Sequence, residues 1–250
     1  MEIFFKHPVN ALITVRSTSS RLPAKCFLPF GEGNVLEHVI QRCLHFGLRP
    51  IVCTTRDKED DAIEIIASRL AVECYRGPTY NKLLRWSECC RHFEIDTFHS
   101  VDADDPFFDG EEIKASMRLL EEGPYDMVCP TVSSSAGGAS VGYSLTAEVV
   151  KRASDEIPIN ADTEMMWYYL EKIQNIRTQV LPEEKPLPFK VRLTLDYAED
   201  YWLLESVRRI SGNFATRQDI NHLFLTNPDL YKINWFRNED WQAGQLAKKL

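Results

Sequence analysis

The chain has 250 residues, of which 44% are hydrophobic and 26% charged, and it carries a formal net charge of −8 at pH 7 with a pI near 5.3. This composition supports a packed core and excludes wholesale disorder. The acidic balance argues against a nucleic-acid partner, whose recognition needs a basic surface, but it allows a local basic pocket for a small phosphate compound.

No apolar segment approaches the roughly 18 residues that a membrane-spanning helix needs, so we expect no membrane partner. The first ten residues lack the layout of a signal peptide. The seven cysteines are odd in number and include no CxxC pair, which indicates reduced thiols. Together these features predict a cytoplasmic protein.

Strand and helix patterns alternate along the first half of the chain. Predicted strands are residues 11–15, 50–55, 72–77, 97–106 (running into an acidic loop) and 125–132, and predicted helices are residues 34–47, 59–72, 81–93 and 111–123. Repeated strand–helix units predict an α/β fold with a mostly parallel, Rossmann-like sheet and helices on both faces. Ligands of such sheets bind beyond the carboxyl ends of the strands, so the loops after the first and fourth strands can face one pocket.

The second half of the chain is less regular. The patterns predict a loop at 133–140, a strand at 141–145, helices at 146–156 and 161–173, a proline-rich connector at 181–188, a strand at 189–196, a helix at 198–210 and an outer helix at 214–230. The chain therefore divides into an α/β core (1–132), an irregular region (133–190), a returning core strand and helix (191–212) and a C-terminal helical tail (213–250).

The stretch RSTSSRLPAK, residues 16–25 and here called the basic loop, directly follows the first predicted strand. Arginine guanidinium groups hold phosphate oxygens bidentately, and a lysine adds a mobile point charge. Hydroxyls and backbone N–H groups of a turning loop complete such a cradle. The loop matches neither the P-loop nor the dinucleotide-binding glycine pattern. Its composition alone fits either a triphosphate site or a solvated basic loop.

The stretch DADDP, residues 102–106 and here called the acidic loop, ends the fourth predicted strand. Asp102, Asp104 and Asp105 repel one another unless a cation or water lies among them. Mg²⁺ prefers a few carboxylates together with waters and phosphate oxygens. The loop is therefore either a metal site or an acidic turn that caps the helix at 111–123.

The stretch VRLTLD, residues 191–196, carries a further carboxylate at its end. In a strand Arg192, Thr194 and Asp196 share one face, because side chains alternate. Asp196 can then reach the same cation as the acidic loop. We expect Asp200, four residues on, to cap the following helix or to pair at the surface.

The segment RSTSSRLPAKCFLPFGEGNVLEHVIQR resembles the opening of the CMP-sugar synthetase superfamily, and it is most similar to CMP-3-deoxy-manno-octulosonate synthetases and to SpsF-like cytidylyltransferases of spore-coat polysaccharide. The resemblance continues in the same order through TTRDKEDDAIEIIASRL, CYRGPTYNKLLRW, VDADDPFFD and VRLTLDYAEDYWLLESVRRI. It spans residues 11 to 234.

This resemblance implies a nucleotidyltransferase that transfers CMP from CTP to an acidic sugar and releases pyrophosphate, with Mg²⁺ as cofactor. The acceptor would be a 2-keto-3-deoxy sugar acid or a similar acid, in the biosynthesis of a surface polysaccharide such as lipopolysaccharide. The resemblance also implies a homodimer.

Position by position, the resemblance assigns Asp104 and Asp196 to the metal, and Arg16, Ser19, Arg21, Lys25 and Arg76 to the nucleotide. We expect Ser17, in the same loop, to bind the nucleotide as well, and Arg16, Lys25 and Asp104 to act in catalysis. The resemblance makes residues 1–132 the nucleotide-binding core and residues 133–190 the acceptor-binding and dimerisation region. The octulosonate enzymes carry a glutamine where this chain has Asp102, a departure that bears on sugar specificity.

For the acceptor, Asp102, Tyr143, Asp162 and Glu164 are polar groups that could read sugar hydroxyls, and Arg192 could pair with a carboxylate. Each of them could instead be an ordinary surface or core residue.

Two other functions fit parts of the sequence. Asp102-Ala-Asp104 is a DxD pattern like that of glycosyltransferases, and a nucleotide sensor on the same fold would need no turnover. The basic loop favours the cytidylyltransferase, because an enzyme that uses a diphosphate sugar has little need for three cations directly after its first strand.

Overall fold

The computed structural model describes residues 8–135, 142–183 and 187–247. Its central sheet has seven strands in the order β5-β4-β1-β6-β8-β7-β9. The strands are β1 (Asn10–Thr14), β4 (Arg49–Thr55), β5 (Glu73–Gly77), β6 (Thr97–Asp102), β7 (Met127–Cys129), β8 (Ser144–Thr146) and β9 (Thr178–Val180). The first four run parallel to one another and β7 runs parallel to β9, while β8 lies antiparallel between β6 and β7. The predicted α/β fold with a mostly parallel sheet is confirmed.

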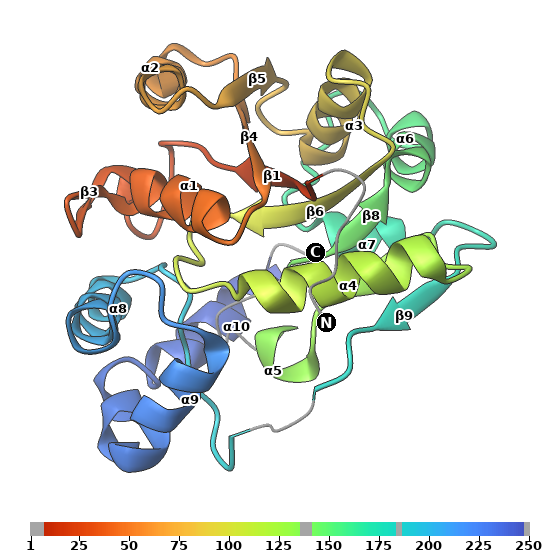
Figure 1. Ribbon diagram of the computed structural model, residues 1–250. Helices are drawn as coiled ribbons and strands as arrows, with labels where there is room; N and C mark the ends of the chain where they lie inside the picture. The colour runs from red at the N-terminus through yellow and green to blue at the C-terminus, as the bar shows by residue number, and fades with distance from the viewer. Residues whose placement is uncertain (1–7, 136–141, 184–186, 248–250) are drawn as a thin grey trace.

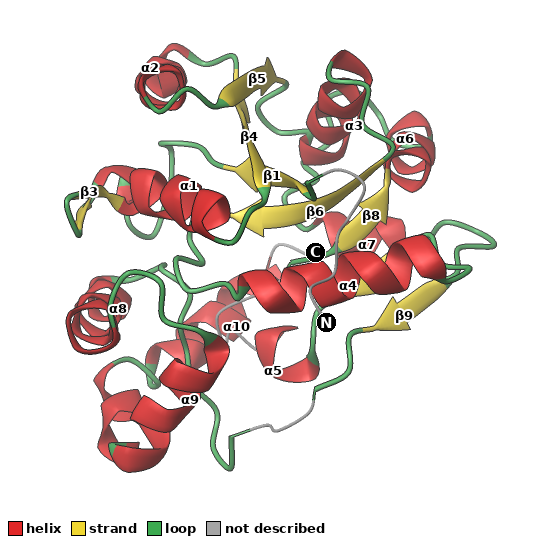
Figure 2. Cartoon of the chain, viewed as in Figure 1, coloured by secondary structure: helices red, strands yellow, loops and turns green. Residues whose placement is uncertain are grey.

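Helices cover both faces of this sheet (Figures 1 and 2). They are α1 (Val35–His45), α2 (Asp61–Arg69), α3 (Lys82–His92), α4 (Gly110–Glu122), α6 (Ala147–Asp155) and α7 (Met166–Leu170). Side chains of β1 alternate between the two cores: Ile13 packs in the core that includes residues of α1, α2 and α4, and Leu12 packs in the core that includes residues of α3, α6 and α7.

A third hydrophobic core lies beside the sheet. It contains Phe107 from the segment after the acidic loop, Leu193 and Leu195, and side chains of two C-terminal helices. Those helices are α8 (Ala198–Ser211) and α9 (Arg217–Thr226), and after them come a 3-10 helix η3 (Pro228–Ile233) and α10 (Arg237–Ala247). Figure 1 shows these C-terminal elements packed together next to the sheet. None of the described helices is long and apolar enough to cross a bilayer.

The short elements of the structure are a 3-10 helix η1 (Lys25–Phe27), a two-stranded hairpin of β2 (Pro29–Phe30) and β3 (Gly33–Asn34), a second 3-10 helix η2 (Lys58–Asp60), and α5 (Val132–Ser135). The hairpin, β9 and α5 are absent from the sequence prediction. The predicted helix at 161–173 is reduced to α7, and the predicted helix at 214–230 is divided into α9 and η3.

The predicted strand at 189–196 is wrong, because these residues, all described, form no strand. Both edges of β6 are already taken, by β1 and by β8, so the segment has no free partner at the centre of the sheet. It lies instead against the acidic loop, where the Leu195 N–H donates to the carbonyl oxygen of Asp104 at 2.7 Å.

Parts of three predicted elements lie outside the described residues: the loop at 133–140, the first residue of the strand at 141–145, and the middle of the connector at 181–188. The division of the chain into four regions stays a prediction.

Candidate active site

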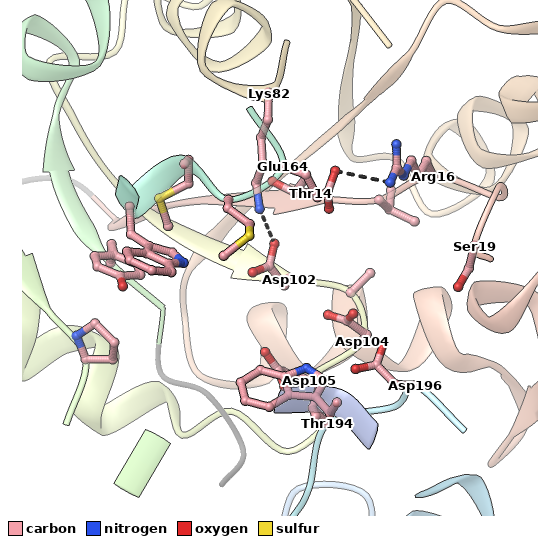
Figure 3. Close-up of a pocket in the computed structure, with 18 of the residues that line it drawn as sticks. Thr14, Arg16, Ser19, Lys82, Asp102, Asp104, Asp105, Glu164, Thr194 and Asp196 are labelled. Carbon is pink, nitrogen blue, oxygen red and sulfur yellow. Dashed lines mark hydrogen bonds and ion pairs between the residues drawn. The ribbon is translucent and has the colours of Figure 1, made fainter. Parts of the chain in front are cut away.

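A cavity of about 920 Å³ opens at the carboxyl ends of β1 and β6. The basic loop lines one side of it, and the acidic loop with Thr194 and Asp196 lines another (Figure 3). The remaining wall comes from α3, residues around β7, β8 and β9, residues 164–167, Glu171 and α10. The parallel sheet thus brings together loops that are some eighty residues apart, as the sequence predicted.

The three cations of the basic loop reach carboxylates from other parts of the chain. Arg16 pairs with Glu164 at 3.3 Å and Arg21 with Asp196 at 2.7 Å. Lys25 Nζ lies between two carboxylates, 2.6 Å from Asp104 and 2.9 Å from Asp196. Ser19 also lines the cavity. The three cations of the basic loop therefore line one cavity and pair with carboxylates there.

The ammonium group of Lys25 interacts strongly with the carboxylates of Asp104 and Asp196. Burial alone would lower the pKa of its ammonium group, but Asp104 and Asp196 outweigh burial and raise that pKa. The Leu195 carbonyl accepts a third hydrogen bond from Nζ at 2.8 Å. The ammonium group of Lys25 thus bridges the carboxylates of Asp104 and Asp196.

The base of the basic loop is anchored by Asp60, which sequence reasoning missed. This carboxylate is 1% exposed, and it accepts hydrogen bonds from the Ser17 N–H at 2.8 Å and the Ser17 hydroxyl at 2.7 Å. The hydroxyls of Thr54 and Thr55, at the end of β4, donate to its other oxygen. Ser17, predicted to bind nucleotide, is thus directed to this anchor and lies outside the cavity wall.

The acidic loop gathers three carboxylates. Ligand oxygens of Asp102, Asp104 and Asp105 lie within 4.8 Å of one another. Asp105 Oδ1 is buried and has no hydrogen-bond partner among the described residues. Burial, followed by the charges of Asp104 and Asp102, raises the pKa of Asp105 well above its usual value. A set of hard oxygen donors with an unpartnered buried oxygen fits a divalent cation such as Mg²⁺.

Lys82, the first residue of α3, is a further cation that sequence reasoning missed. Its side chain is 5% exposed, and its Nζ lies 2.8 Å from Asp102 and 4.9 Å from the centre of the Trp86 ring. It lines the same cavity as Tyr143 and Glu164, which the sequence placed at the acceptor. No motif in the sequence marks Lys82, since its partner is twenty residues away on another element.

Three more predicted site residues lie outside the cavity wall as the described residues form it. Arg76 sits on the edge strand β5 and pairs with Asp61 and Glu64 of α2, at 2.7 and 3.0 Å. Asp162 is exposed, and it accepts the backbone N–H of Glu164. Arg192 is fully buried.

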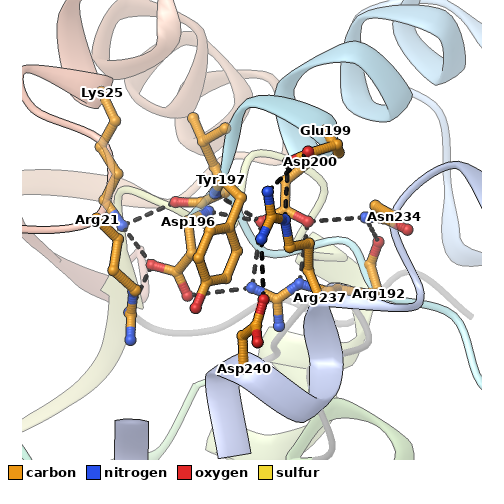
Figure 4. A network of polar contacts seen from close by, with 11 residues as sticks. Arg21, Lys25, Arg192, Asp196, Tyr197, Glu199, Asp200, Asn234, Arg237 and Asp240 are labelled. Carbon is orange, nitrogen blue, oxygen red and sulfur yellow. Dashed lines mark hydrogen bonds and ion pairs between the residues drawn. The ribbon is translucent and has the colours of Figure 1, made fainter.

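Arg192 belongs to a buried polar network behind Asp196 (Figure 4). Its Nε and Nη2 donate to Asp200 at 2.9 and 3.1 Å, and Nη2 also lies 3.2 Å from Asp196. Asp200 in turn accepts the backbone N–H groups of Asp196 and Tyr197, both at 2.9 Å. Asp200 does cap α8, but the alternative of a surface position is wrong, since this carboxylate is completely buried.

Known proteins share the sequence pattern and the fold of this chain. A sequence model of the cytidylyltransferase family matches residues 10–197. The spore coat polysaccharide biosynthesis protein SpsF of Bacillus subtilis is 22% identical over 230 residues, covering 87% of this chain and 94% of that protein.

Two solved structures share the fold. A cytidylyltransferase from Leptospira borgpetersenii serovar Hardjo-bovis superposes with a TM-score of 0.78 at 22% identity, over 90% of this chain and 97% of that one. A CMP:2-keto-3-deoxy-manno-octonic acid synthetase complexed with CTP gives a TM-score of 0.58 at 16% identity, over 81% of this chain and 98% of that one. The family match covers most of the chain, and so the chain belongs to the cytidylyltransferase family and is a CTP-using nucleotidyltransferase.

Proposed function

We propose that the protein transfers CMP from CTP to an acidic sugar, a 2-keto-3-deoxy sugar acid or a similar acid, and releases pyrophosphate in a Mg²⁺-dependent reaction. The observation that carries this proposal is the single cavity in which Arg16, Arg21 and Lys25 face the acidic loop. The name of the Bacillus subtilis relative supports a place in surface polysaccharide biosynthesis, for which lipopolysaccharide is one destination. We place the reaction in the cytoplasm.

The triphosphate would bind at the basic loop. Arg16 and Arg21 are only partly buried, with side chains 28% and 27% exposed, so phosphate oxygens can replace their present carboxylate partners. Ser19 adds a hydroxyl donor, and Lys25 reaches the same space from the end of the loop. These four residues present cationic and neutral donors on one side of the cavity, as a triphosphate requires.

In the reaction, an acceptor hydroxyl oxygen forms a bond to the α-phosphorus as the bond between the α-phosphorus and the bridging oxygen to pyrophosphate breaks. The acceptor proton passes to solvent, and pyrophosphate leaves with the electron pair of the broken bond. Arg16 and Lys25 stabilise the charge that develops on pyrophosphate. Asp104, with Asp102 and Asp105 or with Asp196, would hold Mg²⁺, which supplies charge neutralisation and orientation when bound.

The acceptor would bind in the same cavity beside Asp102, Tyr143 and Glu164, and Glu164 lies next to the basic loop through its contact with Arg16. Arg192 is held by Asp200 and lies away from this space, so Lys82 takes its place in the proposal as the cation for the acceptor carboxylate. We further propose a homodimer formed by region 133–190, which contains the edge strand β9.

The test is a screen for pyrophosphate release with CTP, Mg²⁺ and a panel of 2-keto-3-deoxy acids, amino-sugar acids and phosphonates. Turnover with one of these acids supports the proposal. Release of a nucleoside diphosphate from a nucleotide sugar would instead establish a glycosyltransferase. Binding of CTP without turnover by any acceptor would indicate a nucleotide sensor.

A further inference from the structure

Residues beyond the range that the family model matches also line the cavity. That match ends at residue 197, yet two residues of α10, Trp241 and Gln242, line the cavity. The C-terminal helix thus adds a wall to a site whose known parts all come from earlier in the chain.

Trp241 is held in place by the buried network behind Asp196. The Arg192 guanidinium carbon lies 5.7 Å from the centre of the Trp241 ring and 5.6 Å from that of the Tyr197 ring. Because Asp200 fixes this guanidinium with two hydrogen bonds, the indole packs against a rigid charged group. This contact ties the wall formed by α10 to the network behind Asp196.

Two further contacts fasten the tail to this network (Figure 4). Asn234 donates to the Arg192 carbonyl and to Asp200, each at 2.9 Å. At the first turn of α10, Arg237 pairs with Glu199 of α8 at 2.9 Å and with Asp240 at 2.9 Å. Residues 234–240 therefore dock α10 onto the start of α8, next to Asp196.

The helix lies at the basic-loop end of the cavity. A Cβ atom on Gly244 would be 3.8 Å from Arg21 Nη1, the guanidinium that bonds Asp196. On the assignment proposed above, this end receives the triphosphate, and the present inference rests on that assignment.

We propose that α10 binds the β- and γ-phosphates of CTP, with the Trp241 indole N–H and the Gln242 side-chain amide donating to phosphate oxygens. Both groups are neutral donors. On the proposed assignment Arg16 and Arg21 exchange their carboxylate partners for phosphate oxygens. The two neutral donors of α10 would add hydrogen bonds to the same phosphates.

The test is isothermal titration of CTP and of CMP, each with Mg²⁺, into wild type, Trp241→Phe, Trp241→Ala and Gln242→Ala. Trp241→Phe keeps an aromatic ring against Arg192 and removes the N–H donor. Trp202→Ala is the matched control, because Trp202 is 60% exposed on α8 and lies outside the cavity wall. We expect the Kd for CTP to rise at least about fivefold in the Trp241 and Gln242 variants, with the Kd for CMP within about twofold of wild type.

Kd values for CTP within twofold of wild type in both Trp241→Phe and Gln242→Ala would overturn the inference. Equal weakening of CTP and CMP would also overturn it, since the contact would then be with the nucleoside or the α-phosphate. If Trp241→Ala does not fold, the other two variants decide. Failure of wild type to bind CTP at all would count against the proposed function and not against the role of α10 alone.

Discussion

Lys25 holds together two carboxylates that would repel each other without it, since its Nζ lies within 3 Å of both Asp104 and Asp196. We predict that Lys25→Ala lowers kcat/KM for CTP at least about tenfold, because a lost contact to transition-state charge costs more than about 1.4 kcal/mol. Arg16→Ala should do the same with less loss of stability, since Arg16 is more exposed. Pyrophosphate release measures both effects.

A thermal melt of each variant, measured alongside its activity, shows whether a lower activity comes from a lost contact in the site or from unfolding. Lys151→Ala is the control, because the Lys151 side chain is 61% exposed, pairs with Asp155 on the same helix and lies outside the cavity wall. Wild-type turnover in both Lys25→Ala and Arg16→Ala would remove the basic loop from the site.

The ionisation of the buried Asp60 carboxyl group should make the stability of the fold depend on pH. Burial raises the pKa of Asp60, but hydrogen bonds from Thr55 and Ser17 outweigh burial and hold that pKa below its usual value. A carboxyl group of this kind stabilises the fold fully above its unfolded pKa of about 3.9, and the contribution disappears as the pH falls through the folded pKa. Asp60→Asn should therefore cost about 1–3 kcal/mol at pH 7, and the gap from wild type should narrow below about pH 4.

Urea unfolding of the two proteins at pH 7, 4 and 3 measures this gap. Asp155→Asn, a change at an exposed carboxylate, should show no comparable gap at pH 7. A gap for Asp60→Asn that stays constant down to pH 3 would show that the charge of Asp60 is not what stabilises the loop.

The residues that the sequence could predict are those whose neighbours in the chain carry the same chemistry. Arg16, Arg21 and Lys25 stand in one basic loop, and Asp104 stands in one acidic loop. Composition and position after a strand marked these residues as candidates, and the resemblance to a family favoured a site over a surface turn. Asp60 and Lys82 escaped prediction because each is defined by a partner on another element. Arg192 was assigned to the acceptor from strand alternation, but a nearer carboxylate, Asp200, takes its guanidinium.

Among the elements, the parallel strands and the helices between them were predictable because buried apolar runs and amphipathic periodicity recur at regular spacing. The strand β9 was missed, and α7 was predicted too long. Elements of three to five residues carry little periodicity from which to predict them. Residues 189–196 have the composition of a strand, yet β6, the strand that leads into the acidic loop, is paired on both edges. Only the three-dimensional strand order shows this.

The buried carboxylate of Asp200, at the start of α8, stabilises both this helix and the Arg192 guanidinium. Asp200→Ala removes the cap of the helix and leaves the Arg192 guanidinium buried without its main partner. We expect a loss of about 3–5 kcal/mol in the free energy of unfolding, as for other broken buried ion pairs. Asp229→Ala, at an 84% exposed carboxylate, should change stability by less than about 1 kcal/mol in the same urea experiment.

The double variant Arg192→Met/Asp200→Leu separates the two causes of this loss. Replacing both charges by apolar groups leaves no unpaired buried charge, so it should be more stable than Asp200→Ala. A double variant less stable than Asp200→Ala would mean that the cap and the Asn234 contact, and not the unpaired Arg192, dominate the loss.

At the scale of the whole molecule, electrostatics decides how an acidic protein can bind a polyanion. The net charge is −8, and the cavity wall carries six carboxylate and five cationic side chains among the described residues. A bare triphosphate would therefore enter a site with no excess of positive charge, which Coulomb repulsion from the acidic loop opposes. A divalent cation bound between the triphosphate and the acidic loop would neutralise part of the negative charge of each.

We therefore predict that removing divalent cations with EDTA weakens CTP binding at least about tenfold, a difference of about 1.4 kcal/mol. Isothermal titration of CTP with Mg²⁺ and with EDTA measures it, and circular dichroism checks that the fold is unchanged. Cytidine is the matched ligand, because it carries no phosphate and its affinity should change far less. Equal CTP affinity with and without Mg²⁺ would mean that the basic loop alone outweighs the acidic loop, and that Asp102, Asp104 and Asp105 do not act through a bound cation.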